Sequence, residues 1–549
     1  MLQPLPIGIE NYQETLNKYY VDKTMIIKEV VEYNFSSSIL ITRPRRFGKS
    51  LALSMLETYF SDEINGHQFF ENKKIAKEWP FYQDYLNKYP VIHLNMKNIT
   101  PNSVDTLYEM VKLEISKLYN HFLSRLEGKI NKEEFDIAKA FAGQKASSSL
   151  LTNSIELLSL YLNKTTGMKV VLLIDEYDTP IQNAYYKGFY KETVDFFKTF
   201  YTSALKGNNY LALAVVTGVM QISKESLFSG LNNLKVYSVL DNRLSSYFGF
   251  TETEVVEMLR YYQLDASIET IKHYYGGYLF GNTRLYNPWS VLNFIDNGAK
   301  YRFYWKNSGT NRLLLNNNER ISETIIEIFN EPFIETNINN SISYNDINDS
   351  KNAYLSFLLQ SGYLSITEES ENDFYKLKKP NLEAIDSFKT EIVDRFFNGD
   401  QTSLPSELKK ALLNKNSETI QNIFEKYILS SFSYFDYKNE KNYQVLTLGI
   451  VSILFENSIV KSEVNANQGR CDIMISPKNI NEIGMVLEIK FSKTVLSKKR
   501  LESLSDKGLS QIKETKYYGE LKQRQAKPII IYSFAFDGAH LVVKSEDIK

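Results

Sequence analysis

Three consecutive residues, Gly48, Lys49 and Ser50, have the chemistry needed to hold the phosphates of a nucleotide. Glycine lets the backbone turn in against a phosphate, the lysine ammonium pairs with the β- and γ-phosphates, and the serine hydroxyl is a ligand for magnesium. An apolar stretch precedes them at residues 38–42, and a helix is expected over residues 50–60. The first amide groups and the dipole of that helix would face the anion. We therefore expect ATP and Mg2+ at this loop.

The segment departs from the standard phosphate loop at Arg43, which stands where the first glycine is expected. Two more arginines add positive charge, and a guanidinium group pairs with phosphate through two hydrogen bonds. On this segment alone, two interpretations stay open: a variant phosphate loop, or an ordinary basic loop between a strand and a helix. Under the first interpretation, the nucleotide-binding residues of the loop are Arg43, Arg45, Arg46, Phe47, Gly48, Lys49 and Ser50.

Two acidic residues, Asp175 and Glu176, follow a short apolar stretch that is typical of a buried strand. A carboxylate at such a strand end, near the phosphate loop, can hold magnesium, and an adjacent glutamate can orient and activate the attacking water. We assign Asp175 to the metal and Glu176 as the general base. Asp178 is left open between a role in the site and a solvated turn. Thr217 ends another apolar stretch, and it is open between a contact with the γ-phosphate or water and a plain turn.

A second set of charged residues, Asp472, Glu488 and Lys490, lies in the last part of the chain. On a strand, Glu488 and Lys490 point to one face and their apolar neighbours to the other, so we expect the charged face to open to a cleft. A turn around residues 477–481 would bring Asp472 near Glu488. Two carboxylates can hold a divalent metal, and lysine stabilises charge on a phosphate, as phosphodiester cleavage requires. Gln511 is expected to reach the same cleft; the alternative is alternating charge on a solvated strand.

The elements that must position these residues form two α/β regions. Short apolar stretches at 38–42, 91–95, 169–174 and 210–216 alternate with long amphipathic ones up to about residue 250, which indicates parallel strands with helical crossovers in three layers. Residues 336–351, rich in Asn, Ser and Asp, are expected to form a loop, and a helix plus a hairpin after them suggests a winged-helix unit. We expect four regions: a phosphate-loop domain at 1–250, a helical lid at 251–335, a winged-helix-like and helical connector at 345–430, and a second, smaller α/β domain at 431–549.

Composition narrows the function classes. The chain has 549 residues with 64 basic and 65 acidic side chains, so any basic surface for nucleic acid must be local. Cys471 is the single cysteine, which excludes a disulfide framework and fits a reducing compartment. The longest apolar run, near residues 211–220, is too short to cross a bilayer. These features predict a cytoplasmic protein without a membrane partner.

The motifs in combination resemble the bacterial AAA-ATPase-like family over about the first 300 residues. They are LPIGIE at 5–10, YVDKT at 20–24, TRPRRFGKS at 42–50, IDEYD at 174–178, TG at 217–218, FSGLNNL at 228–234 and YNPWS at 286–290. The resemblance implies a P-loop NTPase fold with ATP binding and hydrolysis. It also implies that an arginine in place of the first glycine is a family trait.

The C-terminal part resembles the restriction-endonuclease-like PD-(D/E)XK nuclease domain. This resemblance implies Asp472, Glu488 and Lys490 as the core triad, with Gln511 as an accessory residue. Residues 462–467 depart from the family pattern, which leaves the first acidic ligand open between Glu456 and Glu463.

Together these observations favour an ATPase coupled to a magnesium-dependent nuclease that acts on DNA or RNA, with DNA favoured. The alternative is an ATP-driven switch or scaffold whose nuclease-like domain binds a partner or nucleic acid without cleaving it. A basic cluster, open between a backbone contact and a solvated helix surface, comprises Lys493, Lys498, Lys499 and Arg500. An oligomer is compatible with the sequence, which does not specify the oligomeric state.

Overall fold

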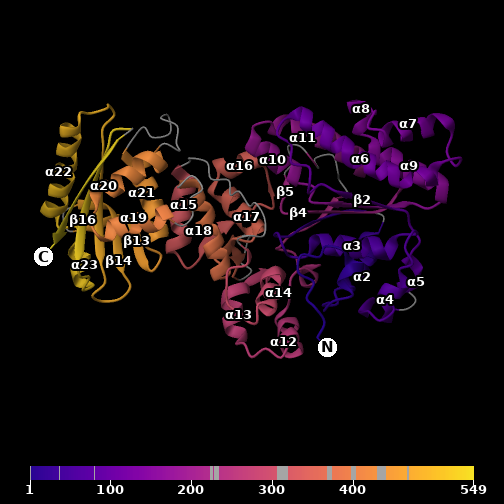
Figure 1. Cartoon of the computed structure of the whole chain (residues 1–549), viewed down its shortest axis with the longest axis horizontal. Coiled ribbons are helices and arrows are strands. Elements are labelled where there is room, and N and C mark those ends of the chain that lie inside the picture. Colours follow the sequence, from indigo (N-terminus) through magenta and orange to yellow (C-terminus); the bar gives the residue numbers. More distant parts are fainter. Residues whose placement is uncertain are drawn as a thin grey trace. The chain divides into compact units, whose positions relative to one another are not determined.

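The chain forms two compact units in the computed structural model, and each is described by itself (Figure 1). The first comprises residues 1–308 and 336–384, and the second comprises residues 309–335 and 385–549. The structure describes residues 2–35, 37–78, 81–222, 227, 234–305, 319–367, 374–396, 403–429, 440–466, 469–538 and 540–548.

A parallel five-stranded sheet forms the centre of the first unit, in the order β2-β3-β4-β1-β6. The strands are β1 (Ser38–Thr42), β2 (Val91–Asn95), β3 (Val170–Asp175), β4 (Leu211–Gly218) and β6 (Leu234–Tyr237). The first two match their predicted bounds, and the next two are shifted by one or two residues. The edge strand β6 was not predicted, because it is only four residues long and only Tyr237 in it is buried.

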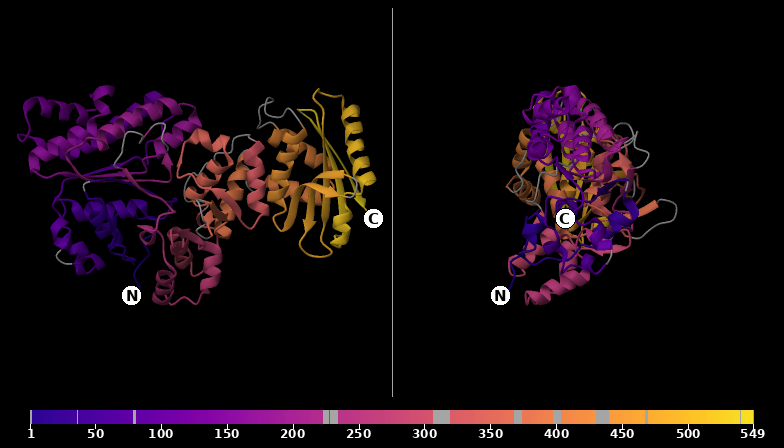
Figure 2. Two further views of the ribbon diagram at one scale, coloured as in Figure 1. Left: turned by 180° about the vertical axis from the view of Figure 1, so that it is seen from behind. Right: turned by 90° about the vertical axis from the view of Figure 1, so that its right-hand side faces the viewer.

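Helices cover both faces of this sheet, which confirms the predicted three-layer fold. Figures 1 and 2 show α3 (Lys49–Phe60) and α2 (Ile26–Asn34) on one side, and α6 (Val104–Leu126), α9 (Ser154–Thr166) and α11 (Tyr190–Leu205) on the other. The longest of these, α6, begins at a capping box in which Ser103 and Thr106 each bind the backbone amide of the other. Its buried residues recur at three- and four-residue intervals, so one face packs on the sheet.

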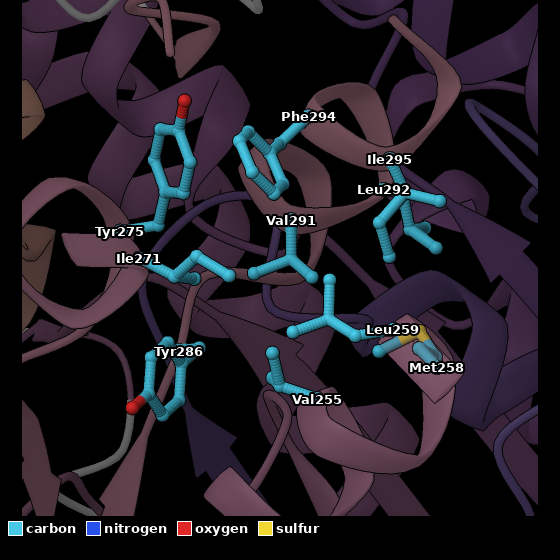
Figure 3. Packing of buried hydrophobic residues seen from close by; sticks show 10 residues of the cluster. All are labelled: Val255, Met258, Leu259, Ile271, Tyr275, Tyr286, Val291, Leu292, Phe294 and Ile295. Carbon is cyan, nitrogen blue, oxygen red and sulfur yellow. The ribbon is translucent and has the colours of Figure 1, made fainter. Parts of the chain in front are cut away.

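A small helical region follows, built from α12 (Glu252–Tyr261), α13 (Ile268–Tyr275) and α14 (Pro288–Asp296). Figure 3 shows the apolar side chains of these helices and of Tyr286 packed around a common core. After α13 ends at Tyr275, the chain forms the hairpin of β7 (Tyr278–Phe280) and β8 (Thr283–Leu285).

Residues 336–351 are not a loop, contrary to the prediction. They contain the end of β9 (Ile334–Asn337), then β10 (Ser341–Ile342) and α16 (Tyr344–Asp349). Two of the polar residues that suggested a loop, Ser343 and Asp346, form a capping box at the start of α16. The helix and hairpin predicted after this segment are confirmed as α17 (Lys351–Ser361), β11 (Ser365–Ile366) and β12 (Phe374–Lys378).

The second unit contains a mixed five-stranded sheet in the order β13-β14-β15-β16-β17. The strands are β13 (Ser458–Ala466), β14 (Gly469–Pro477), β15 (Gly484–Phe491), β16 (Ile529–Phe536) and β17 (Leu541–Ile548). The pairing is antiparallel except between β15 and β16. Helix α22 (Lys498–Thr515) lies on one face, while α21 (Glu440–Leu454), α19 (Ser403–Leu413) and α20 (Ser417–Ile423) lie on the other (Figure 1).

Candidate nucleotide and nuclease sites

The phosphate loop connects β1 to α3 as predicted, and two of its residues have left-handed backbone. Arg46 has a φ of 67° and Gly48 a φ of 88°, so the turn bends sharply just before the helix. Lys49 is the first residue of α3, and its Nζ donates to the carbonyl oxygens of Arg43 at 3.0 Å and Pro44 at 3.1 Å. Burial lowers the pKa of Lys49, against the opposing charges of nearby acidic residues. The ammonium group therefore lies inside the curve of the loop, beside the acidic end of the sheet.

Asp175 is the last residue of β3, and Thr217 lies near the end of β4, the strand between β3 and β1. The Thr217 hydroxyl donates to Asp175 Oδ1 at 2.5 Å. The other carboxylate oxygen, Oδ2, is buried and has no hydrogen-bond partner among the described residues. A buried carboxylate oxygen without a donor is costly, and a cation or a cation-bound water would satisfy it. Asp175 therefore fits the role predicted for it beside magnesium.

The two acidic residues after Asp175 differ in their surroundings. Glu176 is partly exposed, has a φ of 52° and accepts a hydrogen bond from the Thr179 hydroxyl at 3.2 Å. Its carboxylate lies close enough to Lys49 for its charge to oppose the lowering of the lysine pKa by burial. Asp178 is buried and accepts from the amides of Val219 and Met220, at 2.8 Å and 3.3 Å. Asp178 is therefore not a solvated turn residue; it fixes the segment that follows β4.

Arg43 and Phe47 face away from the curve of the loop. The Arg43 guanidinium is fully buried, donates to the carbonyl oxygens of Thr42 at 2.7 Å and Tyr237 at 2.8 Å, and lies near the Phe248 and Phe280 rings. Burial lowers the pKa of Arg43 to about 9, against the charge of Asp241. Phe47 is buried, with its ring centroid 5.0 Å from that of Tyr278. Both side chains anchor the loop to the protein, and we do not include them among the proposed phosphate ligands.

The other two arginines are partly exposed and make side-chain contacts. Arg45 donates to the Gln182 amide oxygen at 2.9 Å. The Arg46 guanidinium lies 4.3 Å from the centre of the Trp289 ring, and the charges of Glu10 and Glu176 act on it. The charge of Glu176, the predicted general base, therefore acts on Arg46.

The remaining motifs of the first unit hold its parts together. Lys23 Nζ donates to the Ser246 carbonyl oxygen at 2.7 Å and pairs with Glu254. Asn287 caps α14 through the Ser290 amide. Residues 228–233, the main part of another motif, lie outside the described residues.

In the second unit, antiparallel pairing of β14 and β15 brings Asp472 beside Glu488, as the predicted turn requires. The ladder between β14 and β15 ends with Ile473 opposite Leu487, so Asp472 and Glu488 are the next pair along it. Here the Asp472 carboxylate replaces a backbone partner, because its Oδ2 accepts from the Ile489 amide at 2.7 Å. That bond holds the carboxylate at the edge of β15.

Glu488 is 2% exposed and pairs with Lys490, whose Nζ is 2.9 Å from Glu488 Oε1. Its Oε2 is buried and has no hydrogen-bond partner among the described residues. Burial and then the charge of Asp472 raise the pKa of Glu488 to about 7, against the effect of Lys490. The pKa of Lys490 is raised, because its hydrogen bond to Glu488 and the surrounding carboxylates outweigh its burial. The charges of Asp472, Glu488 and Lys490 therefore act on one another.

The charged face of β15 is covered, contrary to the expectation of an open cleft. Helix α22 packs on it: a Cβ added at Gly508 would lie 2.2 Å from Ser533 Oγ and 3.5 Å from the Lys490 side chain. Gln511, on the same helix, donates to the Tyr517 hydroxyl at 3.3 Å. Among the described residues it makes no hydrogen bond to Glu488 or Lys490, so its predicted accessory role has no contact to support it.

Helix α21 contributes an acidic residue that the sequence reasoning missed. The charge of Glu440, its first residue, acts on both Glu488 and Lys490. One turn later, Gln444 donates to the Asp472 carbonyl oxygen at 3.2 Å, which fixes the helix against β14. The position of Glu440 at the start of a helix ahead of β13 is the one sequence signal that points to it.

The two acids considered as the first metal ligand have different positions. Glu456 forms an ion pair with Lys389. Glu463 lies in β13 between Ser462 and Val464, which pair with Ile473 and Cys471, so its backbone is opposite Asp472. Across the residues that the structure describes, no group of three or more His, Cys, Asp or Glu side chains is arranged to hold a metal ion. Asp472 and Glu488 are thus the two carboxylates available from the described core.

Comparison with known families identifies both regions. Residues 6–228 match the family model described as "Predicted AAA-ATPase", and residues 438–546 match the PD-(D/E)XK nuclease superfamily. The chain joins an AAA-ATPase-like domain to a PD-(D/E)XK nuclease domain. The AAA-ATPase-like match covers the sheet with Lys49 and Asp175, and the nuclease match covers Asp472, Glu488 and Lys490.

A protein of Azotobacter chroococcum mcd 1, described as "Uncharacterized protein in vnfD 5'region", is 26% identical over 438 residues. The alignment covers 78% of this chain and 77% of that protein, so the similarity extends beyond either domain alone. None of the helices in the described parts of the chain has the length and apolarity of a membrane span.

Proposed function

We propose that the protein is an ATPase coupled to a metal-dependent nuclease that cleaves DNA or RNA backbones, with DNA the favoured substrate. One observation supports both halves. Each domain has a carboxylate with a buried oxygen that lacks a hydrogen-bond partner among the described residues, Asp175 Oδ2 in one and Glu488 Oε2 in the other. Each lies next to a lysine that can pair with phosphate, Lys49 or Lys490. This is the arrangement that phosphoryl chemistry with a divalent metal needs.

In the ATPase half, Lys49 would pair with the β- and γ-phosphates, and Ser50 and Asp175 would hold Mg2+. When bound, Mg2+ would neutralise charge on the phosphates. Thr217 holds the Asp175 carboxylate in place through its 2.5 Å hydrogen bond. Glu176 would orient the attacking water, and its exposure allows water to reach it.

The ATPase half is tested by isothermal titration calorimetry with ATP and Mg2+. Lys49→Ala removes the ammonium inside the loop and should abolish ATP binding, while Lys169→Ala, which changes an exposed lysine at the opposite end of β3 from Asp175, should leave it within about threefold of wild type. Unchanged ATP affinity in Lys49→Ala would contradict the proposal.

In the nuclease half, Asp472 and Glu488 would hold the metal, which when bound would polarise the phosphodiester and activate water. Lys490 would stabilise the negative charge that develops on the phosphate. The exposed cations Lys493, Lys498, Lys499 and Arg500 follow β15 directly, where they could contact a nucleic-acid backbone.

The nuclease half is tested by incubating the full chain with single- and double-stranded DNA and RNA in Mg2+ or Mn2+. Cleavage by wild type and its loss in Lys490→Ala are the expected results. Lys527→Ala, at the far end of the sheet from Lys490, is the matched control and should cleave normally.

A switch or scaffold without cleavage is the second candidate. The observations that favour it are the helix that covers the charged face of β15 and the pKa of about 7 at Glu488, which leaves the metal-free site partly protonated at neutral pH. Nucleotide-dependent binding of nucleic acid without strand scission, with any of the substrates above, would favour this function over the nuclease.

A further inference from the structure

The residues that distinguish this phosphate loop from the standard form contact one region of the first unit. Arg43 and Phe47 lie against β7, and Arg46 lies on Trp289 of α14. We propose that the contact between Arg46 and Trp289 is a latch that nucleotide releases, and that its release is transmitted to the start of α18 (Leu382–Phe396) through Tyr304 and Glu383. This inference rests on the proposed function, because it requires that the loop binds ATP.

The first step is competition for Arg46. Its guanidinium is 4.3 Å from the centre of the Trp289 ring. The backbone of Arg46 is left-handed, with a φ of 67°. The interaction free energy of a guanidinium on an indole face is smaller than that of a guanidinium bound to phosphate through two charge-assisted hydrogen bonds. Arg46 lies three residues before Lys49 and feels the charge of Glu176. A phosphate in the loop would therefore draw Arg46 away from Trp289.

The second step runs through a chain of short hydrogen bonds. Trp289 Nε1 donates to the Tyr304 carbonyl oxygen at 3.0 Å. The amides of Tyr304 and Trp305 donate to Glu383 Oε1 at 2.5 Å and 2.8 Å, and the hydroxyl of Ser290, next to Trp289 in the chain, donates to Glu383 Oε2 at 2.5 Å. Glu383 is 1% exposed, so these donors replace water around its carboxylate. Movement of Trp289 would therefore change the bonds that hold Glu383.

The loop meets this network at a second point. A Cβ added at Gly362 would lie 2.9 Å from Pro44 and 3.6 Å from Trp305, so residue 362 must be a glycine to fit between the loop and the tryptophan. Glu383 is the second residue of α18, and the helix continues past Ala384, where the first compact unit ends. A change at the phosphate loop thus reaches a helix that belongs to both units.

The latch is tested by tryptophan fluorescence, because the chain has three tryptophans. In a chain with Trp79→Phe and Trp305→Phe, Trp289 is the single tryptophan, and excitation at the red edge of the indole band avoids the tyrosines. Saturating ATP with Mg2+ should change its emission, and the added substitution Arg46→Met should remove that change. Hydrogen exchange of residues 382–391 should differ at least about threefold with and without ATP in wild type. Trp289→Phe, which keeps an aromatic face for Arg46 but lacks the Nε1 donor to Tyr304, should lose the difference, and Trp289→Leu should lose it too.

Calorimetry on the same samples separates the two ideas. ATP binding with no change in Trp289 emission and no change in exchange at residues 382–391 would overturn the latch and leave the proposed ATP site standing. Emission changes that persist in Arg46→Met would also overturn it, because the signal would then not arise from Arg46. Absence of ATP binding would overturn both the proposed function and the latch.

Discussion

At the scale of single residues, side chains in similar motifs serve different purposes. Lys49 and Asp175 lie where a nucleotide would need them. Arg43 instead donates to two backbone carbonyl oxygens and lies near two aromatic rings. The identity and order of these residues could be predicted from the sequence. The direction in which each arginine points could not, because it depends on Tyr237 and Phe280, which are distant in the chain.

Arg43→Ala should destabilise the first unit. The change removes two buried hydrogen bonds and leaves a cavity, so we expect the free energy of unfolding in urea to fall by about 3 kcal/mol. ATP affinity of the folded variant should stay within about threefold of wild type. As the matched control, Arg45→Ala removes a partly exposed arginine and should cost less than about 1 kcal/mol. An Arg43→Ala chain of normal stability that no longer binds ATP would show that Arg43 is a phosphate ligand.

The pKa of about 7 at Glu488 predicts a pH-dependent metal affinity. Burial and the charge of Asp472 hold the proton on this carboxyl below pH 7, and a metal can bind only after the proton leaves. The affinity for Mn2+ should therefore rise about tenfold per pH unit below pH 7 and level off above about pH 8. Calorimetry with Mn2+ on a chain that carries Asp175→Asn isolates this site. Glu488→Gln should bind more weakly and lose the slope, while a flat wild-type profile would contradict the prediction.

At the scale of elements, the strands were predicted well where they are buried on both faces, and poorly elsewhere. β1 and β2 are short, mostly buried apolar runs, as expected of parallel strands covered on both faces, although β1 is central and β2 lies at the edge of the sheet. β13 was missed because it is an edge strand with mixed polarity, and α21 because its apolar residues surround the helix and give no amphipathic period. Glu440 at the start of α21 was missed for the same reason.

Gly277 lies where the backbone before β7 packs closely against Pro380. Its φ is 81°, and an added Cβ would lie 2.0 Å from the Pro380 carbonyl oxygen. Gly298 has a φ of 66° with no atom within 4 Å of an added Cβ, so it is the matched control. We expect Gly298→Ala to cost about 1 kcal/mol of unfolding free energy from backbone strain and Gly277→Ala at least about 2 kcal/mol more. Equal costs in urea unfolding would show that the backbone of residue 380 does not approach Gly277.

At the scale of the whole molecule, two proposed sites for phosphate chemistry lie in one chain, and α18 contains residues of both compact units. The AAA-ATPase-like and nuclease domains were predicted from their motifs, and the family comparisons bear them out. The four-region division of the chain stays a prediction, since the described residues separate into two compact units. Which domain controls the other depends on contacts that motifs do not encode.

The most direct measurement of the central claim is cleavage of a labelled DNA duplex and its single strands by the full chain in Mg2+, with and without ATP. We expect wild type to cleave at a rate that ATP changes and Lys490→Ala not to cleave. Lys49→Ala should cleave at a rate that does not respond to ATP. Cleavage that Lys490→Ala retains, or a wild type that binds ATP but cuts no substrate, would contradict it.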